Sequence, residues 1–280
     1  METIFGLDES LLSWLKEDIG GGDVTTLALV APEMETTGII HAKDTGILAG
    51  VDVARRVFEL LEPRIFFNTR LEDGVKLTPG TIIAAVHGSA RAVLTGERLA
   101  LNLLQHMSGV ATRTHELAAI AAPYGAKLVD TRKTTPGLRL LDKYAVRVGG
   151  GANHRLGLYD AILIKDNHIK VAGSIQEALK RAHEYAGHMM KIEIEVESLE
   201  GVEEALAGKA DAIMLDNMAP EAMAKAVKLI DHRAIVEASG GINEETIEAV
   251  AKSGVDVISV GALTHSVKAL DISMDVGEIK

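Results

Sequence analysis

The feature that most constrains the fold is a regular alternation of short apolar runs and helix-like stretches through the second half of the chain. One strand-helix unit takes roughly 21–30 residues, which leaves only short loops between the elements. Strands that alternate with helices in this way form a parallel sheet, because a helix has to return the chain to the same edge. The apolar runs are 127–130, 161–165, 191–197, 212–216, 234–238 and 257–261, and the expected helices are 174–186, 199–208, 219–230 and 243–253.

Two architectures accommodate this pattern, namely a barrel related to the TIM type and an open doubly wound sheet. Nearly every apolar run ends in a charged or small residue at its carboxyl end. Barrel enzymes keep their active sites at this face, so the position of the polar residues favours the barrel. We expect an α/β barrel of six to seven parallel strands over residues 116–267.

The first part of the chain lacks this alternation. A helix is expected over 8–19, strands within 36–49 and 64–94, and one long helix over 95–121. Glycines interrupt the strand patterns, as they do in short strands joined by turns. We therefore predict a smaller α+β domain over 1–115, to which the strand-like segment 268–280 returns.

Composition excludes several classes of protein. The chain of 280 residues contains no cysteine, so disulfides, thiolate metal sites and thiol nucleophiles are ruled out. A net charge of −11 is opposite to the charge of a typical nucleic-acid-binding protein. No run of about 18 apolar residues is present, and the first residues lack the pattern of a signal peptide. We expect a cytoplasmic protein with neither a nucleic acid nor a membrane as its partner.

A basic segment lies inside this acidic chain. Residues 130–170 hold eight Lys or Arg against four Asp, which gives a local charge of +4. Thr131, Arg132 and Lys133 directly follow the first apolar run, where a fork of donors, a point charge and a hydroxyl suit a carboxylate or phosphate. The segment predicts an anion site.

A second group of donors follows a run of three glycines, residues 149–151. His154 and Arg155 come next, and Lys165 ends the second apolar run. A lysine in this place serves either as an anion ligand or as a Schiff-base nucleophile, as in aldolases. His154 and His168 are fourteen residues apart, which fits no compact metal-ligand pattern.

Acidic residues end the next two runs. Glu195 and Asp216 are expected side by side at the barrel mouth, where they can contact Mg²⁺ or stabilise positive charge on a sugar ring. Side chains alternate along a strand, so Glu193 and Glu197 point to the same side as Glu195. The alternation therefore does not tell which of these three faces the site.

Glycine-rich turns follow the last two runs. We expect the turn Ser239, Gly240 and Gly241 to open a helix, and Gly261 and Ala262 to follow the next strand. Loops after the last strands of such barrels commonly bind phosphate through backbone N–H groups.

Taken together, these residues closely resemble the quinolinate phosphoribosyltransferase family, over almost the whole chain. The segment 130–168 is the most specific part, and Asp142 within it stands where glutamate is common. The other matching segments are 17–26, 97–102, 105–112, 193–197, 215–218 and 237–242.

The resemblance implies an α/β N-terminal domain and an incomplete α/β barrel that joins quinolinate to phosphoribosyl pyrophosphate. The products would be nicotinate mononucleotide, pyrophosphate and carbon dioxide, with Mg²⁺ as cofactor and a homodimer as the active unit. Catalytic roles would fall to Lys133, Glu195 and Asp216, of which Glu195 and Asp216 would face the ribose and, directly or indirectly, Mg²⁺. Substrate contacts would come from Thr131, Arg132, Lys133, His154, Arg155 and Lys165 for quinolinate, Arg98 of the neighbouring subunit, and Ser239, Gly240, Gly241, Gly261 and Ala262 for the 5′-phosphate.

Three alternatives remain at this point. A Schiff-base aldolase would use Lys165 or Lys133. A relative with an altered substrate would act on nicotinate or serve molybdate uptake, and a binding protein on the same fold would have no activity. The segment 20–26 carries no expected chemistry and is interpreted as structural, with a place at the dimer contact.

Overall fold

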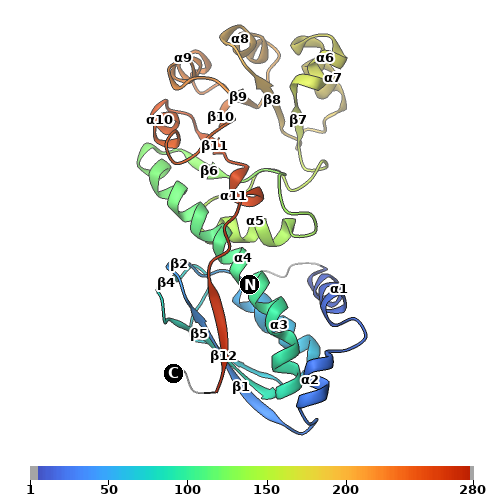
Figure 1. Ribbon diagram of the computed structural model, residues 1–280. Coiled ribbons are helices and arrows are strands. Elements are labelled where there is room, and N and C mark those ends of the chain that lie inside the picture. Colours follow the sequence, from blue (N-terminus) through green and yellow to red (C-terminus); the bar gives the residue numbers. More distant parts are fainter. Residues whose placement is uncertain (1–5, 278–280) are drawn as a thin grey trace. The chain divides into compact units, whose positions relative to one another are not determined.

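The computed structural model describes residues 6–277, and its chain divides into two compact units (Figure 1). The first unit takes in residues up to 113, the segment 136–149 and the residues from 267 onward. The second takes in 114–135 and 150–266. Residues 1–5 and 278–280, where the predictions about a signal peptide and the end of the returning segment fall, lie outside the described residues.

The first unit is built on an antiparallel sheet of four strands. β1 (Glu35–Ala42) lies between β5 (Ile82–Ser89) and β12 (Ile272–Val276), and β3 (Phe66–Asn68) pairs with the other edge of β5. A separate pair is formed by β2 (Gly46–Ile47) and β4 (Lys76–Leu77). The helices are α1 (Leu7–Ile19), α2 (Val24–Leu29), α3 (Val51–Leu61), most of α4 (Ala90–Ala121) and α5 (Arg139–Val148).

The chain's last segment therefore packs within the first unit. β12 pairs with β1 from Gly38–Val276 to Ala42–Ile272. Gly109 on α4 allows the approach to this strand, because a Cβ there would lie 2.3 Å from the carbonyl oxygen of Lys268. A side chain at this position would push the returning segment away from the helix.

The segment 20–26 builds a helix start. The Asp23 carboxylate accepts a hydrogen bond from the Thr26 N–H at 3.0 Å and caps α2. It also accepts from the Thr95 hydroxyl of α4 at 3.1 Å. These contacts hold α2 against α4 and give the segment a structural role.

The second unit is a curved parallel sheet of six strands in the order β6-β11-β10-β9-β8-β7. β6 and β7 are its two edges, so the barrel is incomplete, and the connecting helices lie on the outer side of the sheet (Figure 1). The predicted mixed α/β fold with an incomplete barrel is confirmed. The strands are β6 (Lys127–Val129), β7 (Ile162–Ile164), β8 (Ile192–Val196), β9 (Ala212–Asp216), β10 (Ile235–Ser239) and β11 (Val257–Ser259), and the helices are the short η1 (Ala122–Tyr124), α6 (Asp166–Ala172), α7 (Ile175–Tyr185), α8 (Leu199–Ala207), α9 (Pro220–Ile230), α10 (Ile247–Lys252) and α11 (Ala262–His265).

Helix boundaries follow the local chemistry. The hydroxyls of Ser174 and Ser198 accept from the third backbone N–H of α7 and α8, respectively, and so fix where these helices begin. One face of the sheet is apolar and packs into the core, as shown by Ile194, Ile213 and Ile258, which are fully buried. Within residues 6–277, no helix has both the length and the apolar character needed to cross a bilayer.

Candidate functional site

The carboxyl ends of the six strands surround a hollow of about 630 Å³ in the second unit. Parallel strands all end at the same edge, so residues that are far apart in sequence meet there. With the exception of Arg98, all the predicted site residues line this hollow. They are Thr131, Arg132, Lys133, His154, Arg155, Lys165, Glu195, Asp216, Ser239, Gly240, Gly241, Gly261 and Ala262.

Arg98 does not line this hollow. It belongs to the part of α4 that lies in the first unit. Its side chain is 71% exposed and pairs with the neighbouring Glu97 at 2.7 Å. An exposed guanidinium of this kind is available to an anion outside its own unit.

The segment that carries His154 and Arg155 is anchored by a buried carboxylate. Asp130, which directly follows β6, is fully buried. It accepts a hydrogen bond from the Asn153 side chain at 2.5 Å and one from the His154 backbone N–H at 2.9 Å. A backbone bridge between Val129 and Ala152 fixes the same segment beside β6. The two donors are thereby placed at the strand ends before any ligand binds.

Positive charge is concentrated on one side of the hollow. Burial lowers the pKa of the Arg155 guanidinium, and the positive charge of Arg132 nearby lowers it further. Arg155 donates one hydrogen bond to the carbonyl of Ala161 at 3.1 Å. Like charges placed together in a half-buried site favour an anion with more than one negative charge.

Lys165 and Glu195 form an ion pair across the ends of β7 and β8. A lysine that forms a Schiff base has to be neutral to attack a carbonyl. The amine of Lys165 is instead engaged by the Glu195 carboxylate, so this contact speaks against the aldolase alternative.

The two expected acids occupy neighbouring strand ends. Glu195 and Asp216 lie on β8 and β9, and both are partly exposed to the hollow. Asp216 accepts a hydrogen bond from the side chain of Asn217 at 2.8 Å. Glu193 and Glu197 lie on the same side of the strand as Glu195 but differ from it in exposure. Glu193 is buried, Glu195 is partly exposed and Glu197 is exposed.

One prediction about the glycine-rich turn was wrong. The turn of Ser239, Gly240 and Gly241 does not open a helix, because α10 begins only at Ile247. Gly240 and Gly241 have φ angles of +94° and +62°, which break a right-handed helix and form a compact turn. The side chain of Asn243 then accepts from the backbone N–H of Thr246 at 3.2 Å and shapes the turn that leads into α10.

The second glycine loop does lead directly into a helix. α11 begins at Ala262, with Gly261 as its first flanking residue. The Thr264 hydroxyl donates to the carbonyl of Lys133 at 2.8 Å and ties this loop to the basic one.

Gly240 gives a prediction about the stability of this turn. A Cβ at position 240 would lie 2.2 Å from Oδ1 and 2.9 Å from the backbone nitrogen of Asn217, whereas one at position 241 meets nothing within 4 Å. We expect Gly240→Ala to lower the free energy of unfolding by about 2 to 4 kcal/mol, since it adds a clash to an unfavourable φ. Gly241→Ala carries only the φ penalty of about 1 to 2 kcal/mol and is the matched control. Equal destabilisation of the two variants in denaturant unfolding would contradict this packing.

A cluster that was not expected from the sequence adjoins the hollow, which two of its members, His154 and Glu237, line. Glu193 on β8 and Glu237 on β10 are buried, and their carboxylates lie 3.1 Å and 3.6 Å from Nε2 of His154. Among the described residues these three are the group whose potential metal-ligand atoms lie within 4.8 Å of one another. The sequence signal that could have revealed this cluster is an acidic residue, Glu237, in the middle of the largely apolar strand β10.

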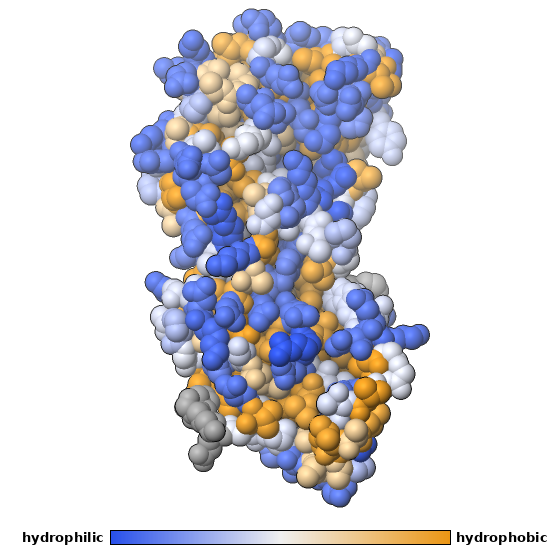
Figure 2. All heavy atoms as spheres, in the orientation of Figure 1, coloured by the Kyte–Doolittle hydropathy of each residue, from blue (hydrophilic) through white to orange (hydrophobic). Residues whose placement is uncertain are grey.

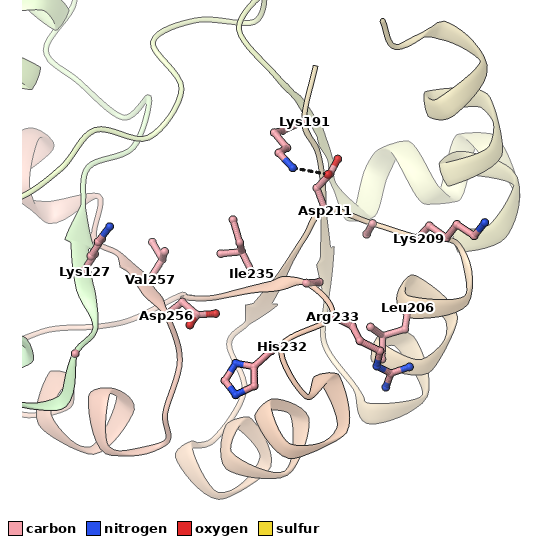
Figure 3. Close-up of a pocket in the computed structure, with 13 residues that line it drawn as sticks. Lys127, Lys191, Leu206, Lys209, Asp211, His232, Arg233, Ile235, Asp256 and Val257 are labelled. Carbon is pink, nitrogen blue, oxygen red and sulfur yellow. Dashed lines mark hydrogen bonds and ion pairs between the residues drawn. The ribbon is translucent and has the colours of Figure 1, made fainter. Parts of the chain in front are cut away.

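A larger hollow of about 860 Å³ lies at the opposite, amino ends of the strands (Figure 3). Two of its four Lys and Arg side chains are bound by the protein itself. Lys191 pairs with Asp211 at 2.7 Å (Figure 3), and Arg233 donates to the carbonyls of Leu229 and Ile230. The amino end of such a barrel serves stability rather than catalysis. We therefore assign the functional site to the smaller hollow.

Comparison with known proteins agrees with this site. Residues 23–108 match the quinolinate phosphoribosyl transferase N-terminal domain, and residues 110–275 match the C-terminal domain of the same family. The chain belongs to the quinolinate phosphoribosyltransferase family. Both domains of the family are present in their usual order, and together the matches cover most of the chain.

Individual members of the family are similar over nearly their full length. The chain is 49% identical to a probable nicotinate-nucleotide pyrophosphorylase [carboxylating] of Bacillus subtilis, over 96% of this chain and 93% of the relative. It is 41% identical to the mitochondrial quinolinate phosphoribosyltransferase [decarboxylating] 2b of Nicotiana tabacum, over 97% and 82%. The crystal structure of NadC from Streptococcus pyogenes superposes with a TM-score of 0.95 at 43% identity, over 100% of this chain and 99% of that one.

Proposed function

We propose that the protein transfers the phosphoribosyl group of phosphoribosyl pyrophosphate to quinolinate and releases pyrophosphate and carbon dioxide, giving nicotinate mononucleotide for de novo NAD biosynthesis. Membership of the family supports the reaction class. The observation that carries the proposal is the hollow at the strand ends, which places four cations and two glycine-rich turns around one cavity. Both substrates are strongly anionic, and the cavity offers an anion site at each side.

The basic side of the hollow suits the two carboxylates of quinolinate. Arg132 and Arg155 offer planar donor pairs, and Lys133 and Lys165 add compact positive charges. His154, next to Arg155, belongs to the same wall. Two adjacent carboxylates on a rigid ring satisfy more of these donors than one does, so we assign this side to the pyridine diacid.

The opposite side of the hollow suits the sugar phosphate. The backbone N–H groups around Gly240, Gly241 and Gly261 can approach a phosphate closely, because no side chain intervenes. Ser239 and Ala262 complete the two turns. We assign the 5′-phosphate to these turns.

Mg²⁺ fits the carboxylates between these two sides. Glu195 and Asp216 present oxygen ligands from adjacent strands, and Mg²⁺ prefers such hard donors. Because Glu195 is already paired with Lys165, we propose that it holds the ion indirectly, through water or the ribose hydroxyls. When bound, the ion would offset the negative charge of the pyrophosphate that leaves.

The reaction requires the protein to position the substrates and to stabilise charge. It does not require a nucleophilic side chain. As pyrophosphate leaves C1 of the ribose, positive charge builds on the sugar ring, and the carboxylates of Glu195 and Asp216 can stabilise it. We assign to Lys133, which lines the hollow, the stabilisation of the departing negative charge. The pyridine nitrogen forms the new bond to C1 and becomes cationic. The bond from C2 to its carboxylate then breaks, carbon dioxide leaves, and the electron pair remains on C2 until it takes a proton.

We further propose that the active unit is a homodimer in which Arg98 reaches the site of the neighbouring subunit. An apolar cluster is exposed on the first unit and is visible around α2 in Figure 2. A patch of this kind marks a surface that another protein covers. The exposed apolar residues in and just after α2 are Val24, Leu27, Leu29 and Met34.

Charge placed in this cluster tests the dimer. We expect Leu29→Asp, at a side chain that is 76% exposed, to convert the protein to a monomer in light scattering and to lower kcat/KM at least about 100-fold, because a buried unpaired charge is costly at an interface. Met189→Asp, at a comparably exposed position of the second unit, is the control and leaves the dimer intact. A Leu29→Asp variant that remains a dimer would remove α2 from the interface.

The choice of acceptor tests the proposed function directly. Nicotinate lacks the second carboxylate and would leave part of the cation set unpaired, so we expect it to be used at least about 100-fold less efficiently than quinolinate. Initial rates with each acid, at saturating phosphoribosyl pyrophosphate and Mg²⁺, give this ratio. Preference for nicotinate would favour the relative with an altered substrate.

We also propose a cytoplasmic location, which the lack of cysteine fits.

A further inference from the structure

Glu193 and Glu237 have no part in the contacts assigned so far, whereas His154, the third member of their cluster, lines the wall assigned to quinolinate. All three side chains are 14% exposed or less. Glu193 and Glu237 each keep one buried oxygen, Oε1, that makes no hydrogen bond. Two ionised carboxylates so placed would lose most of their hydration and repel each other.

The hydrogen bonds of His154 define how its ring is held. Nδ1 accepts the backbone N–H of Arg155 at 2.7 Å, so this nitrogen carries no proton in that contact. Nε2 therefore carries the proton and directs it at Glu193 at 3.1 Å, with Glu237 at 3.6 Å. The ring thus links the carboxyl pair to the backbone of Arg155, one of the cations assigned to quinolinate.

The surroundings of Glu237 favour its neutral form. Glu193 faces it from β8, His154 from the segment after β6, and the Ser259 hydroxyl from β11. On β9 the residue in register with Glu237 is the uncharged Met214. Burial, followed by the negative charge of Glu193, raises the pKa of Glu237 to about 8, while His154 and Ser259 oppose the shift.

We propose that Glu237 is a positioning residue which remains protonated at neutral pH, so that it adds no negative charge to the cluster and helps to hold His154 and Arg155 ready for quinolinate. In this arrangement His154, which lines the wall assigned to quinolinate, also supports the backbone of Arg155. An ionised Glu237 would attract Arg155 inward and repel the substrate dianion. This inference rests on the proposed function, since it takes quinolinate to be the ligand beside Arg155.

The direction in which quinolinate affinity changes with pH follows from the neutral form of Glu237. Below pH 8 Glu237 is protonated and the cation set is free to bind the diacid. Above pH 8 it ionises, and the dissociation constant for quinolinate should rise by up to about tenfold per pH unit, because binding then requires uptake of a proton. Glu237→Gln is neutral at every pH, so it should keep the neutral-pH affinity within about threefold and lose this alkaline rise.

Calorimetric titration of quinolinate into the whole protein between pH 6.5 and 9.5, without phosphoribosyl pyrophosphate or Mg²⁺, tests the proposal. Glu203→Gln on α8, which removes an exposed carboxylate of the same unit, is the control and should behave as wild type. A Glu237→Gln variant that keeps the wild-type alkaline rise, or that folds but binds more than about tenfold worse at pH 7, would overturn the proposal. So would one equivalent of a transition metal in the purified wild type that Glu237→Gln lacks, since the cluster would then be a metal site. Failure of the wild type to bind quinolinate at any pH would instead contradict the proposed function.

Discussion

Replacing Arg132 with alanine should weaken quinolinate binding at least about 100-fold while leaving the fold intact. Loss of one partner from a buried charge pair costs about 2 to 5 kcal/mol, and in the proposed function this residue binds the diacid beside the second guanidinium, Arg155. The loss should appear in KM for quinolinate more than in KM for phosphoribosyl pyrophosphate, since the phosphate turns lie on other strands. Initial-rate kinetics and calorimetry measure the two effects.

The matched control is Arg181→Ala. This arginine lies on the outer helix α7 and pairs with Glu177 at 2.8 Å, away from the strand ends. It should leave both KM values unchanged. If Arg132→Ala bound quinolinate as the wild type does, the assignment of the basic side of the hollow to the diacid would be wrong.

A mixture of two inactive variants should recover activity if Arg98 serves the neighbouring subunit. We expect Arg98→Ala and Asp216→Asn each to lower kcat/KM at least about 100-fold. In a mixed dimer one site carries both substitutions and the other carries neither. Random pairing then restores about a quarter of the wild-type activity, as the two-fold symmetry of a dimer requires.

Co-expression with two different affinity tags isolates the mixed dimer, and its activity per dimer should approach half that of the wild type. Mixing Asp216→Asn with Lys165→Ala is the control, because both positions line the same hollow and every mixed site remains defective. An inactive mixed dimer of Arg98→Ala and Asp216→Asn would show that the site is not shared in this way.

Much of the barrel was predictable because its periodicity is strong. Each of the six apolar runs became a strand of the parallel sheet, and Ser174 and Ser198 marked two helix starts through their caps. The long helix was also expected, although it begins at Ala90 rather than at residue 95. Local signals of this kind act within a few residues and are therefore visible in one sequence.

The site was only partly predictable for a physical reason. The residues at strand ends could be grouped, because parallel strands end together, and the structure does bring Arg132, Lys165 and Asp216 to one cavity. Glu193 and Glu237 were not selected, since their role depends on contacts between strands β8 and β10, which are not neighbours in the sheet. The helix expected over 243–253 is present, but it begins only at Ile247 and is not opened by the turn of Gly240 and Gly241, because both glycines have left-handed φ angles.

The most direct test of the account is the fate of the carboxylate at C2 of quinolinate. Purified protein is incubated with quinolinate labelled with ¹³C in that carboxylate, phosphoribosyl pyrophosphate and Mg²⁺, and the products are followed by NMR. We expect unlabelled nicotinate mononucleotide, pyrophosphate and labelled carbon dioxide in equal amounts, each dependent on both substrates. A nucleotide that retains the label, or no nucleotide from a folded protein that binds both substrates, would contradict it.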